Sequence, residues 1–171
     1  MDPVARINLP APEFVLPDQA GAPFRLVDLR GRLVVLVFWS AECPHATRLD
    51  PHLDGLAQQA GKDVAILRIS DSPSAAQEPP QPSAPASGGV LLIDSQQSVA
   101  ELFGALVTPH IVVIDRSGIV RYSGAPDDVT FLQRTPTRSY LDEALEAVQS
   151  GRLPAPQEVP AFGCAITRRP H

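Results

Sequence analysis

The segment LVVLVFWSAECP, residues 33–44, decides the fold of this chain. Its first seven residues, Leu33 to Trp39, include no charged or amide side chain, the pattern of a strand buried on both faces within a parallel sheet. The segment ends on Cys43 and Pro44, and proline is favoured at the first position of a helix. We therefore expect a buried strand, a short turn, and a helix that begins beside Cys43.

That helix is predicted to run from Pro44 to about Ala60, because apolar residues recur there at helical spacing. The residues on this face are Ala46, Leu49, Leu53, Leu56, Ala57 and Ala60. Pro51 lies inside the span and is expected to kink the helix, because proline lacks the N–H that an interior helical position needs.

Strands alternate with helices along the rest of the chain. The expected elements are strands at 63–70, 90–94, 110–115 and 119–123, and helices near 96–103 and 139–149. Ser139 and Asp142 form a capping pattern at the start of the last helix. This order predicts the α/β class, with a mixed central sheet flanked by helices.

The ends of the chain and one internal segment complete the organisation. Residues 11–31 alternate apolar and polar positions around a turn at 18–21, which predicts an N-terminal β-hairpin. In residues 71–89, 15 of 19 are Pro, Ser, Ala or Gly, which predicts a flexible loop. We therefore divide the chain into one domain, 1–153, and a C-terminal tail, 154–171, that carries Cys164.

Composition excludes several classes of function. With 171 residues, 44% hydrophobic and 19% charged, the chain has the composition of a folded globular domain. A net charge of −5 argues against general nucleic-acid binding. No apolar run approaches the roughly 20 residues of a membrane helix, and the first residues lack an apolar signal core. We expect a cytoplasmic protein with neither nucleic-acid nor membrane partners.

The two cysteines, Cys43 and Cys164, are too few for a disulfide scaffold and form no CxxC pair for zinc. Helix-start N–H groups favour a thiolate, so we expect the pKa of Cys43 to lie below the ordinary ~8.5. The alternative is that Cys43 is a small buried apolar side chain. His45 and His52 lie near Cys43 but lack a fourth ligand, so neither a metal nor another cofactor is expected.

Residues 38–44 resemble the active site of the thioredoxin superfamily, with Trp39 four residues before the nucleophilic cysteine. Pro51 matches the kink proline of that family's active-site helix. Thr108 and Pro109 are similar to the family's cis-proline segment. The resemblance implies a thioredoxin-like fold.

Two further patterns are similar to the redoxin branch, which holds peroxiredoxin-like proteins of the alkyl hydroperoxide reductase/thiol-specific antioxidant type and TlpA-like thiol–disulfide proteins. One is A-P-x-F-x-L-x-D followed by L-x-D-L-R-G-R, at 11–18 and 26–32. The other is the tail sequence Gly-Cys-x-Ile at 163–166. The resemblance covers nearly the whole chain except 71–89.

This resemblance implies a thiol-dependent oxidoreductase in which Cys43 attacks a peroxide or a disulfide. Cys164 would resolve the product, and an external thiol, such as a thioredoxin-type donor, would reduce the pair. The residues that would support this chemistry are Trp39, Ser40, Pro44, Thr108 and Pro109.

The chain also departs from both family patterns. Ala46 stands where thioredoxins carry a second cysteine, so a CxxC dithiol is impossible. Ser40 matches the hydroxyl of the peroxiredoxin motif P-x-x-x-[T/S]-x-x-C, but Leu36 stands at its proline position. Arg48 and Arg121 are candidates for the arginine beside a peroxidatic thiolate, although surface positions are the simpler expectation. A non-catalytic binding module or a redox sensor therefore remains the alternative function.

Overall fold

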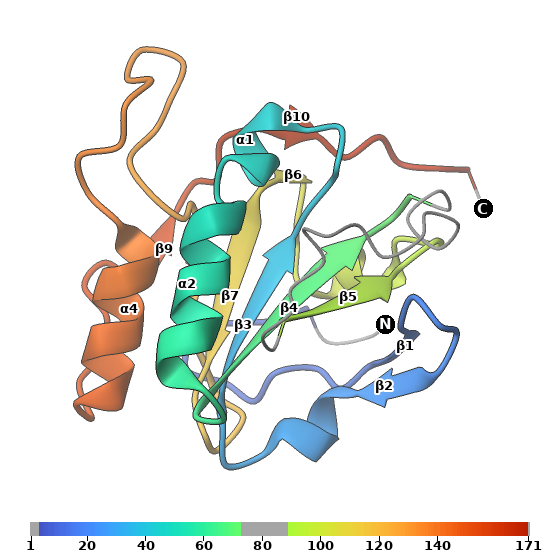
Figure 1. Ribbon diagram of the computed structural model, residues 1–171, viewed down its shortest axis with the longest axis horizontal. Helices are drawn as coiled ribbons and strands as arrows, with labels where there is room; N and C mark the ends of the chain where they lie inside the picture. Colours follow the sequence, from blue (N-terminus) through green and yellow to red (C-terminus); the bar gives the residue numbers. More distant parts are fainter. Residues whose placement is uncertain (1–3, 73–88, 171) are drawn as a thin grey trace.

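The computed structural model describes residues 4–72 and 89–170, so most of the loop expected at 71–89 lies outside these ranges. Its centre is a six-stranded sheet with the order β5-β4-β3-β7-β8-β9 (Figure 1). The strands of this sheet are β3 (Leu33–Phe38), β4 (Val64–Ser70), β5 (Gly89–Ile93), β7 (His110–Ile114), β8 (Val120–Gly124) and β9 (Glu158–Val159). The helices are α1 (Pro44–Thr47), α2 (Asp50–Ala60), α3 (Ser98–Leu102) and α4 (Tyr140–Gln149).

Strand β3 lies at the centre of the sheet, as its unbroken apolar sequence predicts. It pairs parallel with β4 and antiparallel with β7, and all six of its residues are buried. Strands β7 and β8 form the expected antiparallel hairpin. Because the sheet contains both parallel and antiparallel pairs, the predicted mixed sheet is confirmed.

Each face of the sheet packs against its own hydrophobic cluster. Helices α2 and α4 cover one face, where Leu53 and Leu141 are among the fully buried side chains (Figure 1). The N-terminal segment and α3 cover the other face, where Phe14 and Phe103 meet edge to face. Alternate residues of β3 contribute to opposite clusters, which explains why the strand carries no polar position.

The N-terminal hairpin consists of β1 (Val15–Pro17) and β2 (Pro23–Arg25), paired antiparallel. Its turn is stabilised by Asp18, whose carboxylate accepts hydrogen bonds from the backbone N–H groups of Ala20 and Ala22, both at 2.9 Å. A 3-10 helix at Leu26–Leu29 then leads into β3. The predicted hairpin is therefore confirmed.

The helix expected at 44–60 is interrupted rather than kinked. It forms two separate helices, α1 and α2, and Pro51 lies in the first turn of α2. A continuous helix would place the Pro51 ring against the carbonyl of Thr47, whereas a first-turn position needs no N–H donor. The expectation that Pro51 lies mid-helix was therefore wrong.

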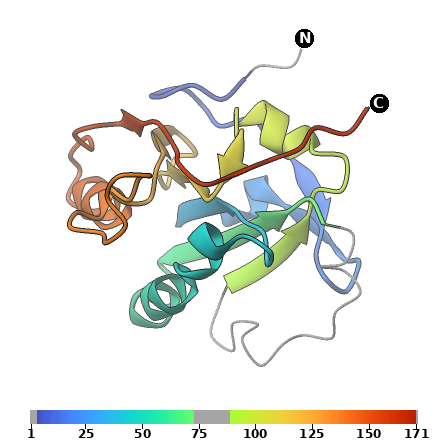
Figure 2. The same ribbon diagram turned by 90° about the horizontal axis from the view of Figure 1, so that it is seen from above.

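The C-terminal tail joins the fold through two short strands that the sequence did not indicate. Strand β9 extends the central sheet by pairing parallel with β8. Strand β10 (Cys164–Ala165) pairs antiparallel with β6 (Val107–Thr108). Figure 2 shows the red C-terminal segment crossing the top of the molecule. Across residues 4–72 and 89–170, no helix is both long and apolar enough to span a bilayer.

Candidate active site

Cys43 occupies the position between a buried strand and a helix that the sequence predicts. It is the N-cap residue of α1, and Pro44 follows as the first helical residue. Its N–H donates to the carbonyl of Ser40 at 3.1 Å, and its own carbonyl accepts from the N–H groups of Ala46 and Thr47. The residue is 2% exposed, so the surrounding chain covers it almost completely.

The structure joins Cys43 to Cys164 in a disulfide. The two residues are 121 apart in sequence, and their Cα atoms are 6.1 Å apart. Strand β10 brings Cys164 there by pairing it with Thr108, the residue that faces Cys43. The two cysteines that the sequence singles out therefore lie in one site.

Thr108 and Pro109 form the wall of this site opposite α1. Their peptide bond is cis, as the resemblance implies, and the Thr108 carbonyl oxygen lies 3.3 Å from Cys43 Sγ. In the disulfide this sulfur carries no proton, but in the reduced chain a Cys43 thiol can donate to that carbonyl. This contact favours the neutral thiol over the thiolate.

Helix α1 is only one turn long, so its dipole favours the thiolate less than the long helix that was expected. The Thr108 carbonyl acts in the opposite direction. A lowered pKa of Cys43 therefore stays a prediction for the reduced protein.

Among the described residues, Ser40 and Trp39 make no hydrogen bond to the sulfur of Cys43. Ser40 Oγ accepts a hydrogen bond from the Glu42 N–H at 3.3 Å, which stabilises the turn before the cysteine. Within the described ranges, this hydroxyl makes no hydrogen bond to either sulfur. Trp39 packs against the cluster on the α2 side of the sheet.

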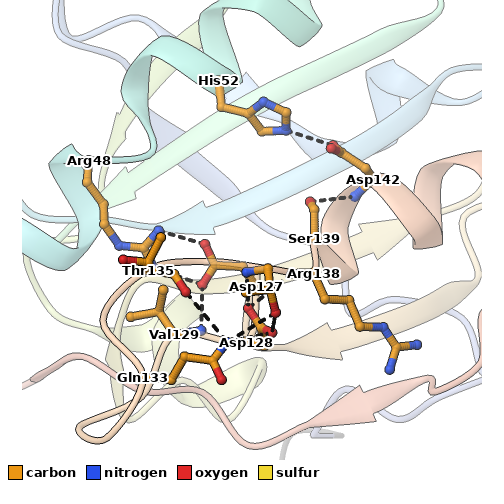
Figure 3. Close-up of polar contacts among 11 residues, drawn as sticks. Arg48, His52, Asp127, Asp128, Val129, Gln133, Thr135, Arg138, Ser139 and Asp142 are labelled. Carbon is orange, nitrogen blue, oxygen red and sulfur yellow. Dashed lines mark hydrogen bonds and ion pairs between the residues drawn. The ribbon is translucent and has the colours of Figure 1, made fainter.

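Both candidate arginines are held by carboxylates instead. Arg48 forms a two-pronged pair with the buried Asp127, at 2.6 and 2.9 Å (Figure 3). Arg121 pairs with Asp115 at 2.8 Å and donates to Asn8. The structure places neither guanidinium in hydrogen-bonding contact with a cysteine sulfur among the residues that it describes.

Hydrogen bonds to Asp128, the neighbour of Asp127, hold together the loop that carries both residues (Figure 3). The Asp128 carboxylate accepts hydrogen bonds from the side chain and N–H of Thr137, from the Arg138 N–H, and from Gln133 Nε2. These bonds, led by that of the Thr137 side chain, hold the pKa of Asp128 well below its ordinary value. The loop thus fixes Asp127, which fixes Arg48 directly after α1.

The three histidines within the described ranges have separate partners. His45 lies edge to face against Phe162 of the tail, with ring centroids 5.1 Å apart. His52 Nε2 lies 2.7 Å from an Asp142 carboxylate oxygen, between α2 and α4. His110 shares a 2.9 Å hydrogen bond with Ser123. Among the described residues, no group of three or more His, Cys, Asp or Glu side chains is placed to hold a metal ion.

His110 gives a testable pH dependence of stability. Burial lowers its pKa from 6.5 to about 4, so the unfolded chain binds the proton first. The contribution of neutral His110 to the free energy of unfolding is therefore fully present above pH 6.5. It is lost as the pH falls from there toward about 4. Between about pH 7 and about pH 5 the loss should reach at most about 2 kcal/mol. We expect His110→Gln to remove this component in urea unfolding measured at both values.

His52→Gln is the matched control, because His52 lies on the exposed surface. The loss of stability between the two pH values should be larger in His52→Gln than in His110→Gln. An equal loss in His110→Gln and the wild type would contradict the assignment to His110.

The tail contacts around Cys164 are the part of the site that the sequence did not reveal. A side chain at Gly163 would overlap the Thr108 carbonyl oxygen, so the tail backbone passes directly against the cis-proline segment. Phe162 contacts His45, and the Ile166 N–H donates to the Leu106 carbonyl at 2.9 Å. The Gly-Cys-x-Ile motif was a signal for the cysteine, but it carried no indication of these contacts.

The sequence matches the AhpC/TSA family over residues 7–123. The methylamine utilization protein MauD of Paracoccus denitrificans is 28% identical over 143 residues, which cover 82% of this chain and 65% of MauD. This chain therefore aligns with less than two thirds of MauD. The thiol-disulfide oxidoreductase ResA of Geobacillus thermodenitrificans is 26% identical over 144 residues, which cover 81% of this chain and 76% of ResA.

Solved structures share the fold. An uncharacterized conserved protein from Geobacillus kaustophilus superposes with a TM-score of 0.82 and 26% identity, and covers 100% of this chain and 95% of its own. Structures of thioredoxin-like proteins with lower identity have the same architecture. The fold is therefore thioredoxin-like.

Proposed function

Because the chain belongs to the AhpC/TSA family, we propose that it is a two-cysteine oxidoreductase that cycles between a dithiol and the Cys43–Cys164 disulfide. Cys43 is the nucleophile and Cys164 is the resolving thiol. The proposed oxidant is a hydroperoxide, and the proposed reductant is an external thiol such as a thioredoxin-type donor.

One observation carries this proposal: the fold brings two cysteines that are 121 residues apart to a Cα separation of 6.1 Å. This separation falls within the range in which a disulfide forms without backbone movement. The chain can therefore complete an oxidation within itself, although Ala46 replaces the second cysteine of a CxxC motif.

The proposed cycle has an oxidation step, a resolution step and a reduction step. The Cys43 thiolate attacks the hydroperoxide, breaks the O–O bond, and becomes a sulfenic acid, while the leaving oxygen takes a proton and departs as an alcohol or water. The Cys164 thiol then displaces the sulfenic oxygen as water and forms the disulfide. Two thiols of the external donor return both cysteines to thiols and become a disulfide themselves.

The exposure of the two cysteines sets the order of the reductive step. Cys43 is buried, whereas Cys164 is partly exposed. A donor thiol therefore attacks Cys164 Sγ and forms a mixed disulfide there, while Cys43 leaves as the thiolate. A second donor thiol then releases Cys164.

Two features favour a small hydroperoxide over a protein disulfide as the oxidant. The first is that the chain belongs to the AhpC/TSA family, and Ser40 stands at the hydroxyl position of the peroxiredoxin motif. The second is that the tail lies on the cis-proline side of Cys43, where β10 already pairs with β6. A protein disulfide would have to displace this strand, whereas a small oxidant needs only a narrow opening.

The proposal is tested by titrating the reduced protein with hydrogen peroxide and, separately, with oxidised glutathione. We expect each peroxide to consume both thiols, and a peptide pair linked through Cys43 and Cys164 to appear in mass spectrometry. Peroxide should react faster than oxidised glutathione, and a thiol donor should sustain turnover.

Other outcomes would change the proposed oxidant, favour the alternative function or refute the proposal. Faster reaction with oxidised glutathione would replace the hydroperoxide by a disulfide oxidant, in line with the activity that ResA carries in its name. A disulfide that forms but that no donor reduces would favour the redox sensor. If oxidised Cys43 never links to Cys164, the proposal is wrong.

A further inference from the structure

Gln97 is buried and lies far from both cysteines in the sequence. Its side chain nevertheless forms hydrogen bonds with the tail that carries Cys164. It is 2% exposed and adopts a left-handed backbone, with φ 60°, immediately before α3. Its Nε2 donates to Asp71 Oδ2 at 2.7 Å and to the Thr167 carbonyl at 2.8 Å. Its Oε1 accepts from the Arg169 N–H at 3.1 Å.

The amide of Gln97 thus bridges the end of β4 and the tail just beyond Cys164. Primary amides offer two donor hydrogens and an acceptor oxygen, and all three functions are used here. Because the side chain is buried, losing these partners would leave polar groups unsatisfied. The contacts therefore hold residues 167–169 in one place.

Arg169 adds contacts to the same region of the fold. Its guanidinium donates to the Ser95 carbonyl at 3.0 Å and to the Asp71 carbonyl at 2.9 Å. We call the set Asp71, Ser95, Gln97, Thr167 and Arg169 the tail clamp. The tail residues of the clamp, Thr167 and Arg169, both follow Cys164 in the sequence.

The tail is also fixed on the N-terminal side of Cys164. The Ser123 N–H donates to the Gln157 carbonyl, and the Ala125 N–H donates to the Val159 carbonyl, each at 3.0 Å. Cys164 therefore lies between two fixed segments. Since neither set of bonds includes a sulfur atom, both sets can persist when the disulfide is reduced.

We propose that Gln97 is a positioning residue that keeps Cys164 beside Cys43 in the reduced protein. This inference rests on the proposed function. It adds the structural feature that speeds the attack of the Cys164 thiol on oxidised Cys43. A tail that is already ordered has little conformational entropy left to lose when the disulfide forms. The clamp therefore raises the effective concentration of the Cys164 thiol at Cys43 and stabilises the disulfide relative to the dithiol.

Gln97→Asn tests the proposal with little disturbance of the backbone. Asparagine tolerates the left-handed conformation, but its amide is one methylene shorter and cannot reach both Asp71 and the tail. We expect the equilibrium constant for disulfide formation, measured against dithiothreitol, to fall about tenfold, which raises the reduction potential by about 30 mV. The amides of Ile166 and Arg169 should exchange faster with solvent in the reduced variant.

Gln96→Asn is the matched control, because Gln96 is the exposed neighbour with the same side chain. It should keep the wild-type equilibrium constant. Arg169→Ala is a second variant that removes two clamp bonds at the exposed tail and should shift the constant in the same direction as Gln97→Asn.

A folded Gln97→Asn protein with the wild-type equilibrium constant would overturn the inference. If Gln97→Asn does not fold, Arg169→Ala decides, and an unchanged constant there would overturn it equally. Failure of the proposed function gives a different result, because the wild type itself would then form no Cys43–Cys164 disulfide on oxidation.

Discussion

Serine in place of Cys43 is expected to abolish peroxide consumption and donor-dependent turnover, down to the rate of a protein-free blank. A serine hydroxyl does not ionise near neutral pH and cannot form a disulfide, so neither half of the cycle can begin. The fold should survive at the lower stability of the reduced wild type, because Cys43→Ser removes the cross-link but replaces one small side chain by another of similar size. Peroxide consumption with a thiol donor, together with circular dichroism, measures both expectations.

Cys164→Ser is the matched comparison, since it removes the same disulfide but leaves the nucleophile. This variant should still react with one equivalent of peroxide and should accumulate the Cys43 sulfenic acid, which dimedone traps for mass spectrometry. Its turnover should then depend on direct attack by an outside thiol. If Cys43→Ser consumed peroxide and Cys164→Ser did not, the roles of the two cysteines would be reversed.

Alanine at Gly163 is expected to lower the equilibrium constant of the disulfide by about a hundredfold, equivalent to about 2.7 kcal/mol. The added Cβ would overlap the Thr108 carbonyl oxygen and approach the Pro109 ring. The tail must then move away from the cis-proline segment. Because Cα atoms more than ~7 Å apart cannot be bridged without backbone movement, even a small displacement opposes the bond. Equilibration with dithiothreitol measures the constant.

Gly55→Ala is the control for a glycine-to-alanine change. A Cβ at Gly55 would meet no atom within 4 Å, and the residue lies inside α2. This variant should keep the wild-type redox equilibrium and should gain up to about 1 kcal/mol of stability from helix propensity. A wild-type disulfide constant in Gly163→Ala would show that the tail can bend around the overlap.

The central fold was predictable because its signals are local and repeated. The apolar run of β3 indicates burial on both faces, and the capping serine, Ser139, marks the start of α4. Its hydroxyl does accept a hydrogen bond from the Asp142 N–H, at 3.2 Å. Patterns of this kind record the environment of each element without reference to the rest of the chain.

The position of Cys43 was predictable for the same reason, but the route by which Cys164 reaches it was not. Strands β9 and β10 have two residues each, too few to show a period. Their pairing depends on backbone groups of β6 and β8 that side chains do not encode. Gln97 shows the same limit, since its partners lie 26 to 72 residues away.

The break between α1 and α2 illustrates a competition that the sequence left open. Apolar spacing favoured a single helix, whereas Pro51 favoured an interruption. The interruption prevailed because a proline is accommodated in the first turn of a new helix. The surface expectation for Arg48 is confirmed, since the residue is exposed, but the sequence did not indicate that its guanidinium pairs with the buried Asp127.

The long sequence separation of the two cysteines couples oxidation to the folding equilibrium. A cross-link between positions 121 residues apart closes most of the chain into a covalent loop. Such a loop restricts the unfolded ensemble by an amount equivalent to about 5 kcal/mol. By the thermodynamic cycle, the native state then holds its disulfide more strongly than the denatured chain does, by the same free energy. Reduction of the disulfide therefore leaves the protein less resistant to denaturation until an oxidant restores the cross-link.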